Sequence, residues 1–171
     1  MEKPKNTYVP FISEVEEFNR TMGKSWQNRT EPTINKSDAD FVINFIQEEL
    51  DELKEAVSEN NIVEVFDALL DIAYVGLGNG AMVFGLKDKM LPGYAEVQAS
   101  NMSKICNTLE EAEETVRVRS IEQGEPCHYV PVRDKYVVYR TSDNKVMKSI
   151  NYFRPNLTQF FTQEEIENTS K

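Results

Sequence analysis

Apolar residues recur at the spacing of an α-helix through the N-terminal half of the chain. Ser13, with Glu16 three residues later, is typical of a helix start, and Gly23 is typical of a helix end. The polar segment over 24–36 resembles a connecting loop. We therefore expect helices over residues 13–22, 37–59, 62–84 and 92–105.

The pattern changes after Cys106. Thr108 with Glu111 predicts the start of a fifth helix, which should end near Gly124. β-Branched and aromatic residues then predict a small antiparallel meander, in which Pro131 favours an edge position for the first strand. We expect its strands over 128–132, 135–140 and 145–147, followed by a loose acidic tail.

These elements predict a mainly α fold, a bundle of four to five helices with a small C-terminal antiparallel β meander. A chain of 171 residues is long enough for one domain with a real core. We expect residues 1–106 to form the helical core and 107–171 to form an α+β extension packed on it, within a single domain.

Charge and composition narrow the class of protein. The formal net charge of -10 disfavours non-specific nucleic-acid binding, which depends on Lys and Arg. No apolar run approaches the roughly 20 residues that cross a bilayer, and we expect no membrane partner. Cys106 and Cys127, with His128 beside them, are too few for a disulfide framework or a structural zinc site. The sequence predicts a cytoplasmic protein.

Glu49 lies in the middle of the apolar face of the second predicted helix. Because successive helical residues are rotated by about 100°, Val42 and Leu53 fall close beside it, and Glu48 and Glu52 flank it on one side. A carboxylate directed into a core is costly unless it is paired or bound to a metal ion. Charge-rich helical runs are usually solvated, but Glu49 does not fit that interpretation.

The third predicted helix carries acidic residues within an almost continuous apolar surface, which is typical of a buried helix. Asp67 and Asp71 are four residues apart and share one face, and Glu64 lies one turn earlier on nearly the same line. Like charges at this spacing repel, so a cation should neutralise them.

A short break over 58–61 makes the two helices antiparallel neighbours. Their acidic faces should then meet as a cluster of four carboxylates: Glu49, Glu52, Asp67 and Asp71. Such oxygen ligands suit Mg²⁺, with Mn²⁺ as an alternative. A structural cluster paired with Arg or Lys is the other interpretation.

These residues resemble the all-α NTP pyrophosphatases, which include the MazG proteins, the dimeric dUTPases and the phosphoribosyl-ATP pyrophosphohydrolases. Glu48-Glu49-Leu-Asp-Glu52 matches the Glu-Glu-x-x-Glu motif of that superfamily. The second motif, Glu-x-x-Asp, matches literally at Glu64-Val-Phe-Asp67, whereas Asp67-Ala-Leu-Leu-Asp71 is similar to the form of phage and bacterial MazG-like proteins. Either Glu64 or Asp71 could therefore complete the set with Asp67.

The resemblance continues toward the C-terminus. Ser-Asn101-Met-Ser-Lys104 resembles a helix in which the Asn and Lys are associated with the nucleotide, although a polar surface pair is the alternative. The segments over 142–148 and 151–157 resemble the ending of the same subgroup, and 107–140 is an insertion with no assigned role.

The resemblance implies Mg²⁺-dependent hydrolysis of a nucleoside triphosphate to the monophosphate and pyrophosphate, in at least a homodimer. Residues 1–106 would be the catalytic core, and Glu48 is the candidate general base, with an outer metal ligand or a solvated residue as the alternatives. The preferred base is not predicted; Trp26, Tyr74 or Tyr94 could stack on it. The alternatives are a phosphoribosyl-ATP pyrophosphohydrolase and a non-catalytic helical binding protein stapled by metal.

Overall fold

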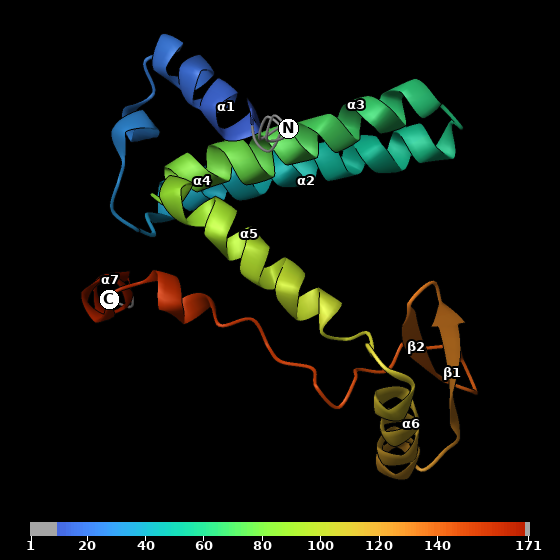
Figure 1. The fold of residues 1–171 in the computed structure, drawn as a ribbon. Coiled ribbons are helices and arrows are strands. Elements are labelled where there is room, and N and C mark those ends of the chain that lie inside the picture. Colours follow the sequence, from blue (N-terminus) through green and yellow to red (C-terminus); the bar gives the residue numbers. More distant parts are fainter. Residues whose placement is uncertain (1–9, 170–171) are drawn as a thin grey trace, which may run out of the picture. The chain divides into compact units, whose positions relative to one another are not determined.

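A computed structural model of the chain describes residues 10–169 (Figure 1). It is mainly helical with one small antiparallel sheet, which confirms the predicted fold class. The elements are α1 (Pro10–Thr21), η1 (Ser25–Asn28), α2 (Lys36–Ser58), α3 (Ile62–Ala73), η2 (Tyr74–Asn79), α4 (Gly80–Val83), α5 (Lys87–Met102), α6 (Leu109–Gln123), β1 (Cys127–Val132), β2 (Lys135–Arg140), η3 (Leu157–Phe160) and α7 (Gln163–Thr169).

The chain forms two compact units, Met1–Met90 with Phe161–Lys171, and Leu91–Phe160. The expected division between residues 106 and 107 stays a prediction. No helix in the described part of the chain is long and apolar enough to cross a membrane.

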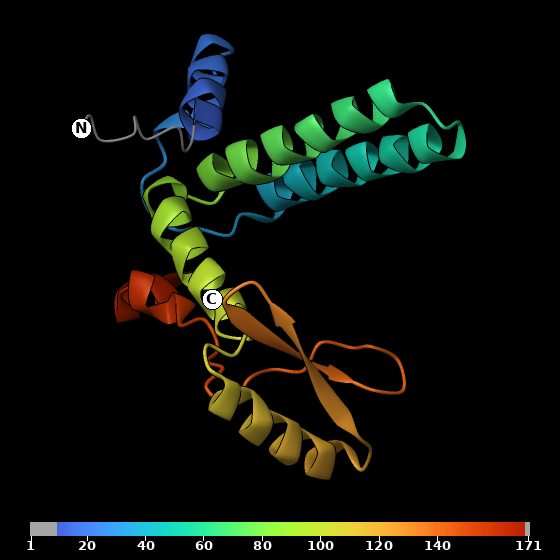
Figure 2. The ribbon, with the colours of Figure 1, turned by 45° about the vertical axis from the view of Figure 1, so that its right-hand side comes forward.

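The first unit is built on an antiparallel hairpin of α2 and α3, which lie side by side in Figures 1 and 2. The side chain of Asn35 caps α2 by accepting from the backbone N–H groups of Ser37 and Asp38, so the cap lies two residues before the predicted start at Ser37. Asn61 caps α3 in the same way. The break over 59–61 therefore makes the predicted turn.

The predicted helix over 62–84 is interrupted by a π-helical turn, η2. Here Gly78 lies against Val15 of α1, so close that a Cβ at Gly78 would come under 3.0 Å from side-chain carbons of Val15. Next to this contact, the buried Asn19 donates to the side-chain oxygen of Asn79 at 2.7 Å. The π turn thus lets α1 approach where glycine leaves room.

The expectation that the third helix is buried on all sides is wrong for the single chain. Ala68 is its one buried residue, and Ile62, Val63 and Phe66 are 75%, 68% and 63% exposed. Neighbouring elements cover only one side of α3, so its other apolar side faces outward.

Two of the predicted helix starts are wrong. In the described residues α1 begins at Pro10, so Ser13 lies inside the helix and does not cap it. Helix α5 begins at Lys87 and ends at Met102, so Pro92 lies inside it at the cost of one backbone hydrogen bond.

The second unit packs α6 against the β1–β2 hairpin (Figure 2). The Thr108 side chain accepts from the N–H of Glu111, as predicted, and Gly124 ends α6 with φ of 68°. The buried core of this unit consists of Cys106, Ala112, Cys127, Val138 and Met147. The predicted third strand is wrong: Val146 makes one isolated bridge to Tyr139.

Two short helices form where the sequence predicted a loose tail at the C-terminus. They are η3 and α7, and α7 belongs to the first unit. Lys89 holds α7 through an ion pair of 3.0 Å with Glu165 and lies over the ring of Phe161, with its ammonium 4.9 Å from the centroid. The sequence gives these acidic residues little apolar periodicity, so the helix was not predicted from it.

Candidate metal centre

Glu49 lies half-buried on α2, between the hairpin helices rather than in solvent. Its Oε2 atom is buried and has no hydrogen-bond partner in the described part of the chain. A buried carboxylate oxygen without a partner is costly, because no interaction replaces its lost hydration. The Glu49 side chain therefore lies on the inward face of α2, as the helical periodicity predicts, and its lost hydration is not replaced by a hydrogen bond in the described part of the chain.

The pKa of the Glu49 carboxyl is raised, mainly because burial disfavours the charged form. The negative charges of Glu52 and Asp71, and then of Glu48 and Asp67, raise the pKa further. The α2–α3 hairpin thus brings the five acidic side chains of both motifs into one electrostatic neighbourhood.

No ion pair joins any of these five carboxylates to a lysine or arginine of the described chain. The alternative interpretation, a structural cluster neutralised by Arg or Lys, therefore finds no support in the structure. The negative charge accumulates along the facing helices without a protein cation to offset it.

The donor set fits a hard divalent cation, because every candidate ligand is a carboxylate and Mg²⁺ prefers oxygen. The buried Oε2 of Glu49 has no hydrogen-bond partner among the described residues and would be available as one ligand atom. Among the described residues, no three His, Cys, Asp or Glu side chains are already grouped closely enough to hold an ion. Metal binding would therefore draw the exposed Glu52 and Asp67 side chains inward.

The position of Glu64 differs from that of Asp71. Asp71 is half-buried, and its charge is among those that raise the pKa of Glu49 most, whereas Glu64 is exposed and is not among them. Glu64 instead lines an open hollow of about 530 Å³ near the α2–α3 turn, together with Glu52, Glu55, Ala56, Glu59 and Asn61. The geometry thus favours Asp71 over Glu64 as the partner of Asp67.

Asn101 and Lys104 lie together in the second unit, at the end of α5. The ammonium of Lys104 donates to the side-chain oxygen of Asn101 at 2.7 Å. Asn101 is exposed and Lys104 is half-buried, so both remain reachable from solvent. Their assignment to the substrate stays a prediction.

The aromatic candidates for base stacking are engaged with other rings or exposed. Trp26 packs on Phe41 at 5.2 Å between ring centroids, and its buried indole N–H has no partner in the described residues. Tyr74 packs edge-on against Phe18 at 6.1 Å, and Tyr94 is 65% exposed. These contacts assign Trp26 and Tyr74 to packing within the first unit.

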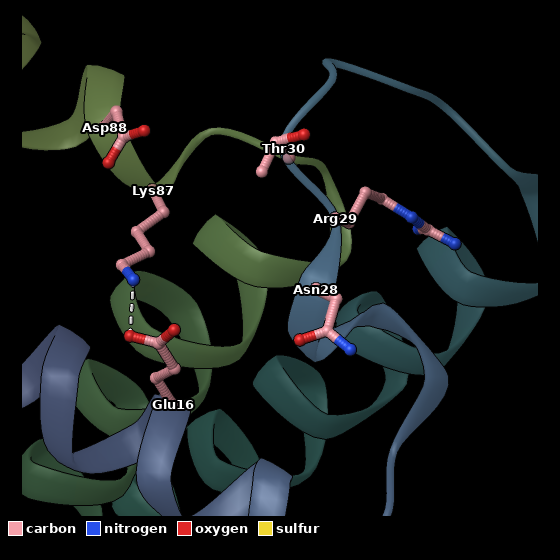
Figure 3. Close-up of a pocket in the computed structure, with 7 residues that line it drawn as sticks. Glu16, Asn28, Arg29, Thr30, Lys87 and Asp88 are labelled. Carbon is pink, nitrogen blue, oxygen red and sulfur yellow. Dashed lines mark hydrogen bonds and ion pairs between the residues drawn. The ribbon is translucent and has the colours of Figure 1, made fainter.

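A second polar pocket of about 210 Å³ was not predicted from the sequence (Figure 3). It is lined by Glu16, Asn28, Arg29, Thr30, Gly85, Lys87 and Asp88. Lys87 points to Glu16 and pairs with it, while the guanidinium of Arg29 extends away from Lys87 to pair with Asp38 at 3.0 Å. The sequence feature that could have indicated this pocket is the length of the polar loop over 24–36, because long loops often contribute to functional sites.

An antiparallel helical hairpin with Glu-Glu-x-x-Glu on one helix and a pair of aspartates on the next defines the class, the all-α NTP pyrophosphatases. The sequence model of the phosphoribosyl-ATP pyrophosphohydrolase family matches residues 15–101, which covers both acidic motifs. The chain belongs to this family.

The chain is also similar to the uncharacterized protein L479 of Acanthamoeba polyphaga mimivirus. The two are 41% identical over 75 residues, which make up 42% of this chain and 30% of the viral protein. The similarity thus spans less than a third of the relative.

Proposed function

We propose that the protein is a Mg²⁺-dependent nucleoside triphosphate pyrophosphohydrolase, which releases a nucleoside monophosphate and pyrophosphate. The observation that carries the proposal is the buried oxygen of Glu49, which has neither a hydrogen-bond partner nor a neutralising cation in the described part of the chain and lies among four further carboxylates. Membership of a pyrophosphohydrolase family supports the same chemistry.

Glu49, Glu52, Asp67 and Asp71 would hold Mg²⁺, or Mn²⁺, through their carboxylate oxygens. When bound, the metal would neutralise charge on phosphate oxygens and lower the pKa of a bound water. The half-buried Glu49 and Asp71 would anchor the ion, while the exposed Glu52 and Asp67 adjust to it.

Glu48 is our candidate general base. It is exposed, and its charge acts on Glu49, so it lies at the margin of the cluster and can receive a proton. In the proposed reaction a water oxygen bonds to a phosphorus of the α–β anhydride, Glu48 accepts the water proton, and the bond to the bridging oxygen breaks. Hydrolysis in ¹⁸O-labelled water identifies the attacked phosphorus by which product carries the label.

We assign Asn101 and Lys104 to substrate binding, with Lys104 offsetting charge on the departing pyrophosphate. The support is their resemblance to the nucleotide-associated Asn and Lys of the superfamily and the hydrogen bond between them.

We further propose that the protein works as a homodimer. The apolar side of α3 is exposed in the single chain, and α2 adds exposed Ile43, Leu50 and Val57. Apolar surface of this extent marks an interaction site, and a second copy offers an identical surface for an isologous contact. Such a contact would bury α3 as its sequence predicts.

Phosphoribosyl-ATP is the second candidate substrate, favoured by the description of the matching family. It is itself a triphosphate, so the same carboxylates would serve. The test is pyrophosphate release from a panel of canonical and modified NTPs and dNTPs and from phosphoribosyl-ATP, with Mg²⁺ or Mn²⁺. Preference for phosphoribosyl-ATP would establish the second candidate, and metal-dependent melting with no hydrolysis would indicate a metal-stapled binding protein.

A further inference from the structure

Two lysines from separate segments of the second unit lie beside one phenol, that of Tyr152. The ammonium of Lys148 is 4.3 Å from the centroid of the Tyr152 ring. The pKa of Tyr152 is lowered, first by its hydrogen bond with Ser100 and then by the charges of Lys148 and Lys104. The Tyr152 phenol therefore has Lys148 over its ring and the charge of Lys104 nearby, and the buried Ser100 lies close to it.

Hydrogen bonds hold the segment 148–153 against the end of α5. The N–H of Ser149 donates to the carbonyl of Lys104 at 3.1 Å. Further along, the Ser100 hydroxyl donates to the carbonyl of Phe153 at 2.9 Å, and the Phe153 N–H donates to the Ser103 hydroxyl at 3.2 Å. These bonds fix the backbone on both sides of Tyr152, so the arrangement does not depend on surface side chains alone.

Among residues 10–169, neither lysine is engaged by a counter-charge. In the part of the chain that the structure describes, no carboxylate forms an ion pair with Lys104 or Lys148. The lysine side chains are not used to cap α5 either, because backbone N–H groups of residues 103–105 already satisfy its last carbonyls. Two ammonium groups near one phenol, with no acid paired to either among the described residues, favour an anionic ligand.

We propose that Lys148 and Tyr152, together with Lys104 and Asn101, form a phosphate-binding site on the second unit. Its ligand is a phosphate anion with more than one negative charge, either inorganic pyrophosphate or the phosphate chain of a nucleotide. Two ammonium groups, a phenol O–H and an amide N–H supply the charge-assisted and neutral donors that phosphate oxygens need. Assigning this anion to the substrate or product rests on the proposed function, whereas the binding itself does not.

The test is calorimetric titration of the whole chain with sodium pyrophosphate in buffer with a chelator, so that no divalent metal contributes. Wild type should bind saturably, and Lys148→Ala or Lys104→Ala should each weaken binding about tenfold, the loss of one charge-assisted contact. Tyr152→Phe should weaken it by about threefold. Lys145→Ala removes an exposed lysine three residues before Lys148, outside the proposed site, and should leave affinity unchanged.

The proposal is overturned if wild type shows no saturable pyrophosphate binding, or if Lys148→Ala and Lys104→Ala bind as tightly as wild type. Lys148→Arg keeps the positive charge and should retain most of the affinity, which distinguishes loss of charge from loss of folding as the cause of weaker binding. The melting temperatures of all variants provide a second check on folding. Loss of affinity in Lys145→Ala equal to that in Lys148→Ala would also contradict a defined site.

A non-hydrolysable α,β-methylene triphosphate analogue distinguishes the two sources. Competition between the analogue and pyrophosphate, lost in Lys148→Ala, would assign the site to a nucleotide phosphate chain; binding of pyrophosphate without competition would assign it to a free anion. Both outcomes support the site. The measurement needs no turnover, so failure of the proposed hydrolysis and failure of this site give different results.

Discussion

The carboxylate of Asp71 on α3 lies near enough to that of Glu49 on α2 for its charge to raise the pKa of Glu49. The two residues come from different motifs, and the antiparallel hairpin brings them together. Burial of Glu49 adds to the effect and is the larger cause. The hairpin thus concentrates negative charge at a point where no lysine or arginine of residues 10–169 forms an ion pair with it.

Stability without metal should depend on the protonation of Glu49. A raised pKa in the folded state means that protonated Glu49 favours folding; this stability is present below its usual pKa of 4.5 and is lost as pH rises through the raised value. Chemical denaturation between about pH 4 and 8, within reach of a shifted carboxyl, should show wild type losing stability relative to Glu49→Gln. Mg²⁺ should restore wild type only, and parallel profiles would contradict this account.

Gly78→Ala should destabilise the first unit. The added Cβ would collide with Val15, which is fully buried and cannot move aside; overpacking of this kind costs about 1–3 kcal/mol. Gly93→Ala is the matched control, because its Cβ would meet nothing within 4 Å and alanine favours helix by about 0.5–1 kcal/mol. Val15→Ala should partly rescue Gly78→Ala in thermal melts, and additive losses would refute direct contact.

Phe66→Glu should separate the proposed homodimer. Phe66 is 63% exposed on α3, and a charge there would be desolvated in a contact between copies. Ile121→Glu is the control, because Ile121 is 70% exposed but lies on α6 in the other unit. Light scattering after size-exclusion chromatography should show monomers for Phe66→Glu and dimers for wild type and Ile121→Glu; a monomeric wild type would refute the proposal.

Glu48→Gln should distinguish a base from a metal ligand. As the base, Glu48 contributes to kcat, so the variant should lose about 10²-fold or more in kcat while its dependence on Mg²⁺ concentration stays unchanged. The acidic limb of the pH–rate profile should also change. A raised Mg²⁺ requirement with wild-type kcat at saturation would instead make Glu48 an outer ligand.

The helical hairpin and the inward position of Glu49 could be predicted because they depend on local periodicity. Val42 and Glu49, seven residues apart, fall on the same apolar face by sequence spacing alone, and the short break at Asn60 leaves room only for a tight turn. The strands of the β hairpin were predicted within one residue, since β-branched and aromatic residues are concentrated there.

The errors arise where distant contacts decide the structure. Neither the π turn at Gly78 nor its contact with Val15 has a local signal, because α1 is remote in sequence. The exposure of Phe66 cannot be read from its own helix, since periodicity shows an apolar face but not what covers it. Lys148 and Tyr152 lie near Lys104 because hydrogen bonds connect two segments that are far apart in the chain. Local sequence patterns carry no signal for such contacts.

Pyrophosphate release by wild type, Glu49→Gln and Glu55→Gln tests the central claim most directly. Glu55 is an exposed glutamate on the same helix and is not among the charges that raise the pKa of Glu49 most, so it provides the matched control. We expect Mg²⁺-dependent pyrophosphate release by wild type and by Glu55→Gln. In Glu49→Gln the rate of release should fall by at least about 10²-fold, as it does when one electrostatic contributor is removed from an active site. Equal release by Glu49→Gln and wild type, or no release by wild type from any triphosphate, would contradict a metal-dependent pyrophosphohydrolase centred on Glu49.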